Sequence, residues 1–501
     1  MATLAEIRIR RLRLLALFAT LLVAYCASSS NAISGSNQVL LGVDDQLKNS
    51  HSIESRRMDD LDGIIHGRRG AGVGPASPAG EAIPSTSSAG PSSGSEAEDV
   101  FTGKPLEQWE LLEGRMLLEK YARFTKKELR QRSAPDFYKR AIDLFLPPSS
   151  VIEVVKPDGT SEWLRRGDFL GSGGVGIVCE VQRLPDTATA LPQKLAAKFY
   201  FHHGDTGTTL TQAEAALQKH ITGEMEATNM LLEKKPSEEL HGLGVGVAFG
   251  VYHMKRGDGY PPVQRTEVLS DGQLTTVFIS TQVTLMPVFG PDMFDIRIIN
   301  AKKTLLKAVF YDTVLAVANL NMLGYVHGDL KPENLVVDLE SGQVKLIDLT
   351  SVTPMGSCRP DAVHWTVMQT SPERLRAAFA GQTHHPSEAD DAWALGITLF
   401  QMLTNYEHPY STEASRKDGW DLVRLLIDSI KPGRFQAPDM AVLGLSARET
   451  RMQLLEIVKL LTEPNKEERW TPRKLMERHP FFQVVDTGEA SSERLGASSL
   501  A

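Results

Sequence analysis

The sequence is poor in cysteine and has no excess of positive charge. Its 501 residues include three cysteines, Cys26, Cys179 and Cys358, which are far too few to build a disulfide-stapled extracellular scaffold. A total of 54 Lys+Arg against 62 Asp+Glu gives a formal net charge of −8. Proteins that bind nucleic acid by neutralising phosphates need a basic face, so this composition argues against a nucleic-acid partner.

Long apolar runs are also missing, apart from a short one near the N-terminus. Four arginines between residues 8 and 13 precede an apolar run over residues 14–27. A transmembrane helix needs about 20 apolar residues, so this run is short for a membrane anchor and favours a secretory signal peptide, which we predict over residues 1–32. An uncleaved anchor or an unrelated amphipathic helix is the alternative. We expect the mature chain to be soluble and secreted, without a transmembrane segment.

Two segments separate the signal peptide from the globular region. Residues 33–103 are rich in Ser, Gly, Pro and Ala without periodicity, which predicts a disordered leader or processed pro-region. A helical pattern follows within residues 104–150, which we predict to be a helical extension. We expect its apolar face to pack on the next domain, while contact with a membrane surface or a partner is the alternative. That face consists of Trp109, Leu112, Met116, Leu117, Tyr121 and Phe124.

Residues 151–485 form the globular part of the sequence, and residues 486–501 are a small polar tail that we predict to be flexible. Short β-like runs occupy the first part of the globular region, and long helical patterns, such as that over residues 305–323, occupy the rest. Strands grouped in one part and helices in the other predict an α+β fold with a β-rich lobe and an α-helical lobe. We find no internal repeats.

A glycine-rich stretch over residues 171–178 reads Gly-Ser-Gly-Gly-Val-Gly-Ile-Val. Glycines at this spacing let backbone amides approach phosphate oxygens that side chains would block. Dinucleotide-binding folds use similar spacing, but here the next segment looks like a strand and not a helix. Lys198 follows in an apolar strand, either as a snorkelling surface residue or as the ammonium that grips nucleotide phosphates.

A more specific motif covers residues 327–334 and reads His-Gly-Asp-Leu-Lys-Pro-Glu-Asn. It brings Asp329, Lys331 and Asn334 together on a loop, because glycine and proline both discourage helix. A carboxylate that orients a hydroxyl, an ammonium that neutralises a moving phosphoryl group and an amide that binds Mg²⁺ suit phosphoryl transfer. Asp348 ends a later strand and supplies a second hard oxygen ligand for Mg²⁺.

In this order, the motifs resemble the eukaryotic protein kinase family. The resemblance implies a bilobal protein-kinase-like fold, with a β-rich N-lobe, an α-helical C-lobe, an N-terminal helical extension, and ATP and Mg²⁺ in the cleft. Asp329 then matches the catalytic base. Lys331 and Lys198 match the catalytic lysines, and Lys331 is typical of Ser/Thr kinases. Asn334 and Asp348 match the metal ligands.

The same resemblance implies the residues that bind ATP. We favour Glu224 over Glu226 as the ion-pair partner of Lys198, because small or apolar residues follow Glu224 at three and seven positions. The segment from residue 285 to 288 looks like the hinge against which adenine docks. The implied ATP-binding set is Gly171, Ser172, Gly173, Gly174, Val175, Gly176, Val178, Ala196, Lys198, Glu224, Leu285, Met286 and Val288.

Other matches to the family are structural. Glu373 and Arg469 look like its buried ion pair, and Thr366 matches the threonine that contacts the catalytic aspartate and lysine. Asp391 and Trp393 look like part of the helix that anchors the catalytic loop. We expect Cys179 to be a buried strand residue and not a redox switch.

The sequence departs from the family pattern at two places. Gly328 replaces the arginine that binds an activation-loop phosphate, so we predict that phosphatase treatment leaves most kinase activity intact. Leu349 and Thr350 follow Asp348 where phenylalanine and glycine are usual. Because threonine cannot easily take glycine-only backbone angles, we expect Thr350 to limit how this loop moves.

The signal peptide, leader, helical extension and His-Gly-Asp motif together look like the rhoptry kinase family of apicomplexan parasites such as Toxoplasma. The resemblance implies delivery through the rhoptry into the host cell or the parasitophorous vacuole. Because the glycine-rich loop, the catalytic base and the metal ligands are all retained, we expect an active Ser/Thr kinase that transfers phosphate from Mg-ATP to protein substrates, including host-cell proteins. An ATP-binding pseudokinase that regulates a partner by docking is the second hypothesis, and a small-molecule kinase or unrelated two-lobed binder is the third.

Overall fold

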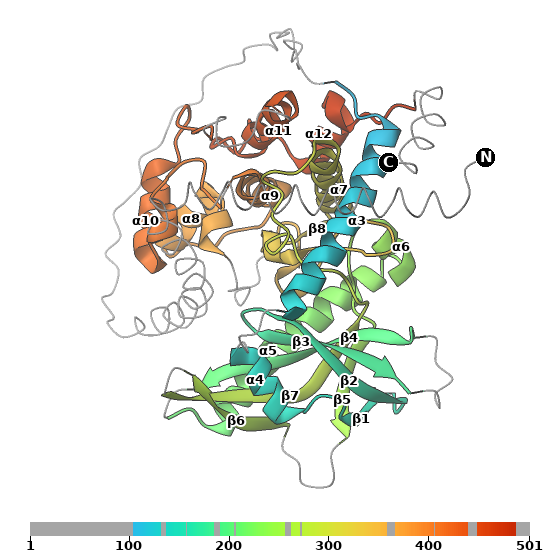
Figure 1. Cartoon of the computed structure of the whole chain (residues 1–501). Coiled ribbons are helices and arrows are strands. Elements are labelled where there is room, and N and C mark those ends of the chain that lie inside the picture. Colours follow the sequence, from blue (N-terminus) through green and yellow to red (C-terminus); the bar gives the residue numbers. More distant parts are fainter. Residues whose placement is uncertain are drawn as a thin grey trace, which may run out of the picture. The chain divides into compact units, whose positions relative to one another are not determined.

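The computed structural model describes residues 104–486 apart from 132–136, 157, 185–190, 205–206, 256–261, 271–272, 358–365, 405 and 439–447 (Figure 1). The predicted signal peptide and leader lie outside the described residues, as do Cys26, Cys358 and the predicted tail after Asp486. Within the described part of the chain, no helix has the length and apolar character needed to cross a membrane.

Seven antiparallel strands form the sheet of the β-rich lobe. Six of them close into a barrel in the order β4-β3-β2-β1-β5-β7, because β7 pairs with β4 as well as with β5. β6 pairs with the first part of β7, on the side that β5 occupies further along. Closure leaves these six strands without free edges over most of their length. The strands are β1 (Val151–Val155), β2 (Ser161–Ser172), β3 (Gly176–Arg183), β4 (Lys194–Gly204), β5 (Gly250–Lys255), β6 (Val263–Ser270) and β7 (Gln273–Met286).

Alternation along β4 sends its side chains to two different apolar clusters. Ala197 and Phe199 belong to the barrel core, together with Cys179, which is fully buried as predicted. Burial raises the pKa of the Cys179 thiol. Since side chains alternate along a strand, Tyr200 points the other way and packs in the second cluster with Leu217 of α5 (Leu210–Leu232).

Local sequence features explain why two helices form in the β-rich lobe. α5 begins at a capping box in which Thr209 and Gln212 satisfy each other's backbone amides. α4 (Phe137–Phe145) belongs to the predicted helical extension, and its apolar residues join the barrel core. Its Asp143 pairs with the buried Arg166 of β2 at 2.6 Å. The short helix α6 (Ser237–Gly242) follows α5.

The helical lobe forms around α7 and α9, whose residues are almost all buried. Arg469 and Glu373 form the predicted ion pair at 2.7 Å, beside the buried ring of Trp393. The helices are α7 (Lys303–Met322), α8 (Pro372–Phe379), α9 (Glu388–Leu403), α10 (Gly419–Ser429), α11 (Arg448–Leu461) and α12 (Pro472–Arg478). Short strands are β8 (Tyr325–Val326), β9 (Leu335–Val337), β10 (Val344–Leu346) and β11 (Thr353–Pro354). The 3₁₀ helices are η1 (Pro332–Asn334), η2 (Leu349–Ser351), η3 (Val367–Gln369), η4 (Ala414–Arg416) and η6 (Pro480–Phe482).

The helix α3 (Gln108–Gln131) packs on α7, as expected for an accessory helix (Figure 1). Two ion pairs join the helices, Glu110 with Lys307 and Arg115 with Asp312, each at 2.6 Å. Between them Gly114 lies so close to α7 that a Cβ atom there would sit 2.1 Å from the carbonyl oxygen of Thr304.

The predicted packing face of this helix is wrong for most of its residues, although Leu117 packs half-buried against the core of the helical lobe. Leu112, Met116, Tyr121 and Phe124 are 45% to 60% exposed, whereas Leu118 and Ala122 are fully buried. The face that contacts α7 carries a glycine and two charged residues beside Leu111, and glycine and charged residues do not contribute to an apolar periodicity. A membrane or partner contact by the exposed apolar residues stays a prediction.

Candidate active site

The predicted phosphate-binding glycines lie in the hairpin between β2 and β3. The amide of Gly173 donates to the carbonyl of Gly176 at 2.9 Å and closes this turn. A Cβ atom at Gly176 would lie 2.7 Å from Cε of Lys198, while Gly171 and Gly173 face open space. The backbone can therefore approach a ligand closely over this hairpin, as phosphate binding requires. Ser172, Gly174, Val175 and Val178 complete the hairpin and its flanking strands.

Three charged side chains from distant parts of the chain meet at Lys198 on β4. Its Nζ lies 2.7 Å from Oε2 of Glu224 on α5 and 3.2 Å from Oδ1 of Asp348. Glu226, the other candidate partner, is exposed. The structure thus pairs the lysine with the glutamate that the sequence favoured.

The electrostatics of this group favour its charged form. Burial alone would lower the pKa of Lys198, but the carboxylates of Asp348 and Glu224 outweigh burial and hold that pKa above its ordinary value. Burial would likewise raise the pKa of Asp348, but Lys198, Lys331 and the hydroxyl of Thr350 hold it well below its ordinary value. Lysine and aspartate are therefore both ionised at neutral pH.

The loop between β8 and β9 brings Asp329, Lys331 and Asn334 together. Lys331 Nζ lies 3.0 Å from Oδ2 of Asp329, and the amide of Asn334 donates to the Asp329 carbonyl at 2.8 Å. Thr366 donates to Oδ1 of Asp329 from its amide at 3.0 Å and its hydroxyl at 2.8 Å, and accepts from Lys331 at 3.3 Å. Thr366 therefore makes the contacts that the resemblance implies.

Asp329 is held as a carboxylate. Burial would raise its pKa, but the ammonium of Lys331 and the hydroxyl of Thr366 outweigh burial and lower the pKa below its ordinary value. An ionised carboxylate that accepts several hydrogen bonds keeps a fixed orientation, which is what a group that orients a substrate hydroxyl needs.

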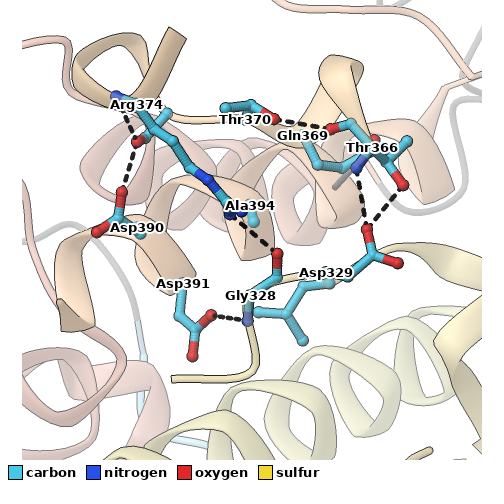
Figure 2. A pocket seen from close by; sticks show the side chains of 11 residues that line it. Gly328, Asp329, Thr366, Gln369, Thr370, Arg374, Asp390, Asp391 and Ala394 are labelled. Atoms are coloured by element: carbon cyan, nitrogen blue, oxygen red, sulfur yellow. Dashed lines mark hydrogen bonds between the residues drawn. The ribbon is translucent and has the colours of Figure 1, made fainter. Parts of the chain in front are cut away.

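Asp391 of α9 fixes the backbone that precedes this loop. Its carboxylate accepts from the amide of Gly328 at 3.1 Å (Figure 2). It also accepts from the amide of His327 at 2.8 Å and from the side-chain amide of Asn321 at 2.9 Å. His327 is fully buried. The catalytic loop is thus anchored on the core of the helical lobe, as the resemblance predicts.

The structure gives a steric reason for the glycine at position 328. Gly328 has a φ of 79°, a left-handed angle that favours glycine, and a Cβ atom there would lie 2.9 Å from the carbonyl oxygen of Ser351. The guanidinium of Arg374, on α8, donates to the Gly328 carbonyl at 3.1 Å (Figure 2). An arginine side chain therefore reaches this loop from another element, beside Asp390 and Asp391 in the small pocket of Figure 2.

The expected backbone constraint at Thr350 is not found there. Thr350 lies in η2, and the left-handed residue is Asp348, with a φ of 59°. The Thr350 hydroxyl donates to Oδ1 of Asp348 at 2.9 Å. Threonine at this place therefore adds a hydrogen bond to the aspartate and takes no glycine-only angle.

The predicted hinge, residues 285–288, begins in the last two residues of β7. Met286 pairs with Ala196 of β4, which is buried. Leu285 is fully buried in the barrel core, and its carbonyl accepts from the amide of Phe249 at 2.8 Å. Met286 and Val288 are half-buried, as is Pro287 between them, so all three have atoms open to a ligand.

The side chains at the predicted metal site fit Mg²⁺. Both hydrogen bonds to Asp348 within the described residues go to Oδ1, which leaves Oδ2 for a metal ion. Asn334 uses its amide nitrogen on Asp329, which leaves its amide oxygen. Two protein oxygens suit Mg²⁺, which takes its other ligands from water and substrate phosphates. Accordingly, no group of three or more His, Cys, Asp or Glu side chains in the described ranges forms a metal cage.

The structure adds residues that the sequence did not single out. Tyr200 of β4 bonds to Glu224 of the Lys198–Glu224 pair, Thr284 of β7 bonds to the Tyr200 hydroxyl, and Arg374 contacts the catalytic loop. One feature of the sequence could have identified Tyr200: it follows Lys198 by two residues and therefore lies on the same face of the strand. Thr284 and Arg374 reach the site through nonlocal contacts, which the sequence does not mark.

Comparison with known proteins supports the class that this geometry defines. Residues 289–482 match the protein kinase domain family. The chain is 31% identical over 199 residues to the human serine/threonine-protein kinase MRCK gamma, and 39% identical over 101 residues to the Caenorhabditis elegans serine/threonine-protein kinase mrck-1. These matches cover 38% and 19% of this chain, but only 12% and 6% of those longer proteins.

Two solved structures share the fold. The ROP18 kinase domain in complex with AMP-PNP and sucrose has a TM-score of 0.52 at 20% identity, and the match covers 74% of this chain and 95% of that chain. ROP2 from Toxoplasma gondii, described as a virulence factor with a protein-kinase fold and no enzymatic activity, has a TM-score of 0.51 at 15% identity, covering 77% and 97%. The chain therefore shares the protein-kinase fold, and the predicted fold is confirmed.

Proposed function

We propose that this chain is an active serine/threonine protein kinase that transfers the γ-phosphoryl group of Mg-ATP to protein hydroxyls. The observation that carries the proposal is the assembled constellation of Lys198, Glu224 and Asp348 beside Asp329, Lys331 and Asn334. These groups come from different elements and meet with the charges that phosphoryl transfer requires.

The chain's own residues supply positioning and charge in this reaction. Lys198, fixed by Glu224, would hold the nucleotide phosphates, and Asp329 would orient the attacking hydroxyl and accept its proton. As the new oxygen–phosphorus bond forms, the bond to the leaving ADP oxygen breaks, and Lys331 neutralises charge on the moving phosphoryl group. Mg²⁺ held by Asp348 and Asn334 would offset the phosphate charge.

The test is phosphate transfer from labelled Mg-ATP by the purified protein, with myelin basic protein as acceptor. D329A and D348A should each lower kcat by at least about a hundredfold, because each removes a group that acts on the reacting atoms. D329A should still bind nucleotide, since Asp329 is assigned to the hydroxyl of the protein substrate and not to the nucleotide. Wild-type protein that binds nucleotide yet transfers no phosphate would contradict the proposal.

A nucleotide-binding pseudokinase is the second candidate. Two observations favour it: the replacement of the catalytic-loop arginine by Gly328, and the shared fold with ROP2, whose description denies it enzymatic activity. The same assay separates the two candidates. A pseudokinase would bind Mg-ATP with unchanged affinity in D329A and would show no transfer above that variant.

We further propose that the chain is secreted and acts as a rhoptry effector in the host cell or the parasitophorous vacuole. The support is the signal-peptide pattern at residues 1–32 and the fold shared with rhoptry kinases. N-terminal sequencing of the protein recovered from its native cells tests secretion, because a mature chain should lack residues 1–32. Microscopy with a rhoptry marker tests the compartment.

A further inference from the structure

The Lys198–Glu224 pair has a third member, the buried tyrosine Tyr200. The Tyr200 hydroxyl donates to Oε2 of Glu224 at 2.8 Å, the same oxygen that accepts from Lys198. Tyr200 is fully buried and Glu224 is 5% exposed. A hydrogen bond to a buried carboxylate is stronger than one between neutral groups, because the charge has little competing water.

Thr284 of β7 orients this tyrosine. Its Oγ1 lies 2.6 Å from the Tyr200 hydroxyl oxygen, and Thr284 is 1% exposed. Tyrosine has one hydroxyl proton, which goes to Glu224, so the threonine hydroxyl must donate to the tyrosine oxygen. A chain of hydrogen bonds therefore runs from β7 through β4 to α5, with each member buried in the β-rich lobe.

The tyrosine ring holds the same helix by packing. It belongs to the apolar cluster that includes Leu217 and Ile221 of α5 and Phe278 of β7. Lys198 Nζ also lies 5.4 Å from the centre of the Tyr200 ring, within cation–π range. Tyr200 thus packs on α5, donates a hydrogen bond to Glu224 of that helix and contacts Lys198, the ion-pair partner of Glu224.

We infer that Tyr200 is a positioning residue that holds Glu224 and α5 in place against the sheet, whatever the state of the activation segment. The inference rests on the proposed function and concerns its regulation. Gly328 removes the arginine through which an activation-segment phosphate would act, so phosphate cannot order the site by that route. Tyr200 acts instead from inside the β-rich lobe, where its bonds depend only on the folded sheet.

The test compares Y200F with a matched control, Y252F. Phenylalanine keeps the ring and deletes only the hydroxyl in both variants. Tyr252 is also fully buried in the barrel, and its hydroxyl makes no hydrogen bond to any active-site residue within the described part of the chain. We expect Y200F to lower kcat/KM for myelin basic protein by about tenfold. Y252F should match the wild type, and neither variant should lose its cooperative thermal transition.

Hydrogen exchange measured by mass spectrometry gives a readout that does not need catalysis. Y200F should speed exchange several-fold in peptides from the middle of α5, because the helix loses its tether to β4. Peptides from α7 and α9 should be unchanged. A double variant, Y200F with E224Q, should be no less active than E224Q alone, since both substitutions break one coupled unit.

The outcomes separate this inference from the proposed function. Exchange in α5 and kcat/KM both equal to Y252F would overturn the role of Tyr200 in an enzyme that is otherwise active. If the wild-type protein transferred no phosphate, the proposed function would be overturned. Faster hydrogen exchange in α5 of Y200F would still support the positioning role of Tyr200 in that case. If the wild type were inactive and hydrogen exchange in α5 were unchanged in Y200F, the positioning role of Tyr200 would be overturned as well.

Discussion

Thr366 contacts both Asp329 and Lys331, the two loop residues to which the proposed reaction gives the substrate hydroxyl and the moving phosphoryl group. It donates twice to Asp329 and accepts from Lys331, although its own hydroxyl transfers nothing. Thr366 follows Asp329 by 37 residues and Lys331 by 35 residues. The fold therefore has to bring the segment that contains Thr366 back to the loop that contains Asp329 and Lys331. Small positioning contacts of this kind decide how fully the carboxylate is oriented when substrate arrives.

We predict that T366V lowers kcat while leaving the KM for ATP nearly unchanged. Valine removes the hydroxyl bond to a charged carboxylate, worth about 1.5–3 kcal/mol, which corresponds to a loss of about tenfold to a hundredfold in rate. T366S keeps the hydroxyl and should recover most of the activity. Steady-state kinetics on all three proteins check this, and equal kcat in T366V and the wild type would contradict the assigned contact.

Two left-handed glycines allow a second test at this scale. Gly328 and Gly324 both have positive φ angles, 79° and 91°, but only Gly328 is crowded by the Ser351 carbonyl. Alanine at either position pays the left-handed strain of about 1–2 kcal/mol. G328A should be the less stable of the two, because its Cβ must also displace that carbonyl. Urea unfolding measures both, and equal stability would show that the crowding is relieved without loss.

Residues close in sequence were the easiest part of the site to predict. Asp329, Lys331 and Asn334 lie within one short loop, so their proximity follows from the chain itself. The Lys198–Glu224 pair was predictable only through the family resemblance, and the choice of Glu224 depended on its helical face. Thr350 shows the limit of such prediction, because no feature of the sequence indicates that the left-handed angle falls on Asp348.

At the scale of elements, α3 is tied to α7 by a tight glycine contact. A Cβ at Gly114 would overlap the Thr304 carbonyl and lie 2.6 Å from the Ala308 Cβ. The two helices can approach so closely at this point because Gly114 has no side chain and faces the small Ala308. The ion pairs on either side then fix the register of the contact.

We predict that G114A destabilises the protein by about 1–3 kcal/mol, as expected when an extra carbon is forced into a packed contact. G242A is the matched control, because a Cβ at Gly242 in α6 meets no atom within 4 Å. It should be neutral or stabilising by up to about 1 kcal/mol, since alanine restricts the unfolded chain. The free energy of unfolding in urea measures both, and a neutral G114A would contradict the tight docking of α3.

Strand pairing was harder to predict than strand existence. Six of the seven strands of the β-rich lobe correspond to apolar runs, but β6 reads Val-Gln-Arg-Thr-Glu-Val-Leu-Ser and has no such run. Closure of the barrel depends on pairing between β4 and β7, whose residues are about 80 positions apart, as in Lys198 with Thr284. Local sequence patterns carry no information about contacts at that separation.

At the scale of the whole molecule, buried histidines link stability to pH. His408 is 3% exposed, and burial lowers its pKa from 6.5 to about 3. Burial lowers the pKa of His479 to about 4 in the same way. The folded protein keeps both rings neutral, whereas the unfolded chain takes up protons below about pH 6.5. This stabilisation is therefore complete above pH 6.5 and is lost as the pH falls toward the folded-state values.

We predict that the free energy of unfolding falls on acidification below about pH 6.5, with each histidine contributing up to about 1.4 kcal/mol per pH unit. H408N removes one titrating ring and should give a shallower slope between about pH 6.5 and 4.5. H385N is the control, because His385 is exposed. Urea unfolding at several pH values tests this, and identical slopes for H408N and the wild type would contradict the buried, neutral state of His408.

The two ends of the described domain are paired with each other. The amide of Gln108 donates to the carbonyl of Val485, and the amide of Val485 donates to the carbonyl of Leu106. The carbonyl of Lys104 also accepts from the side-chain amide of Gln453. A circular permutant that joins these ends through a short linker, with new termini in an exposed turn, should fold without rebuilding the core. The same proximity means that any segments attached before and after the domain leave it from one point on the helical lobe.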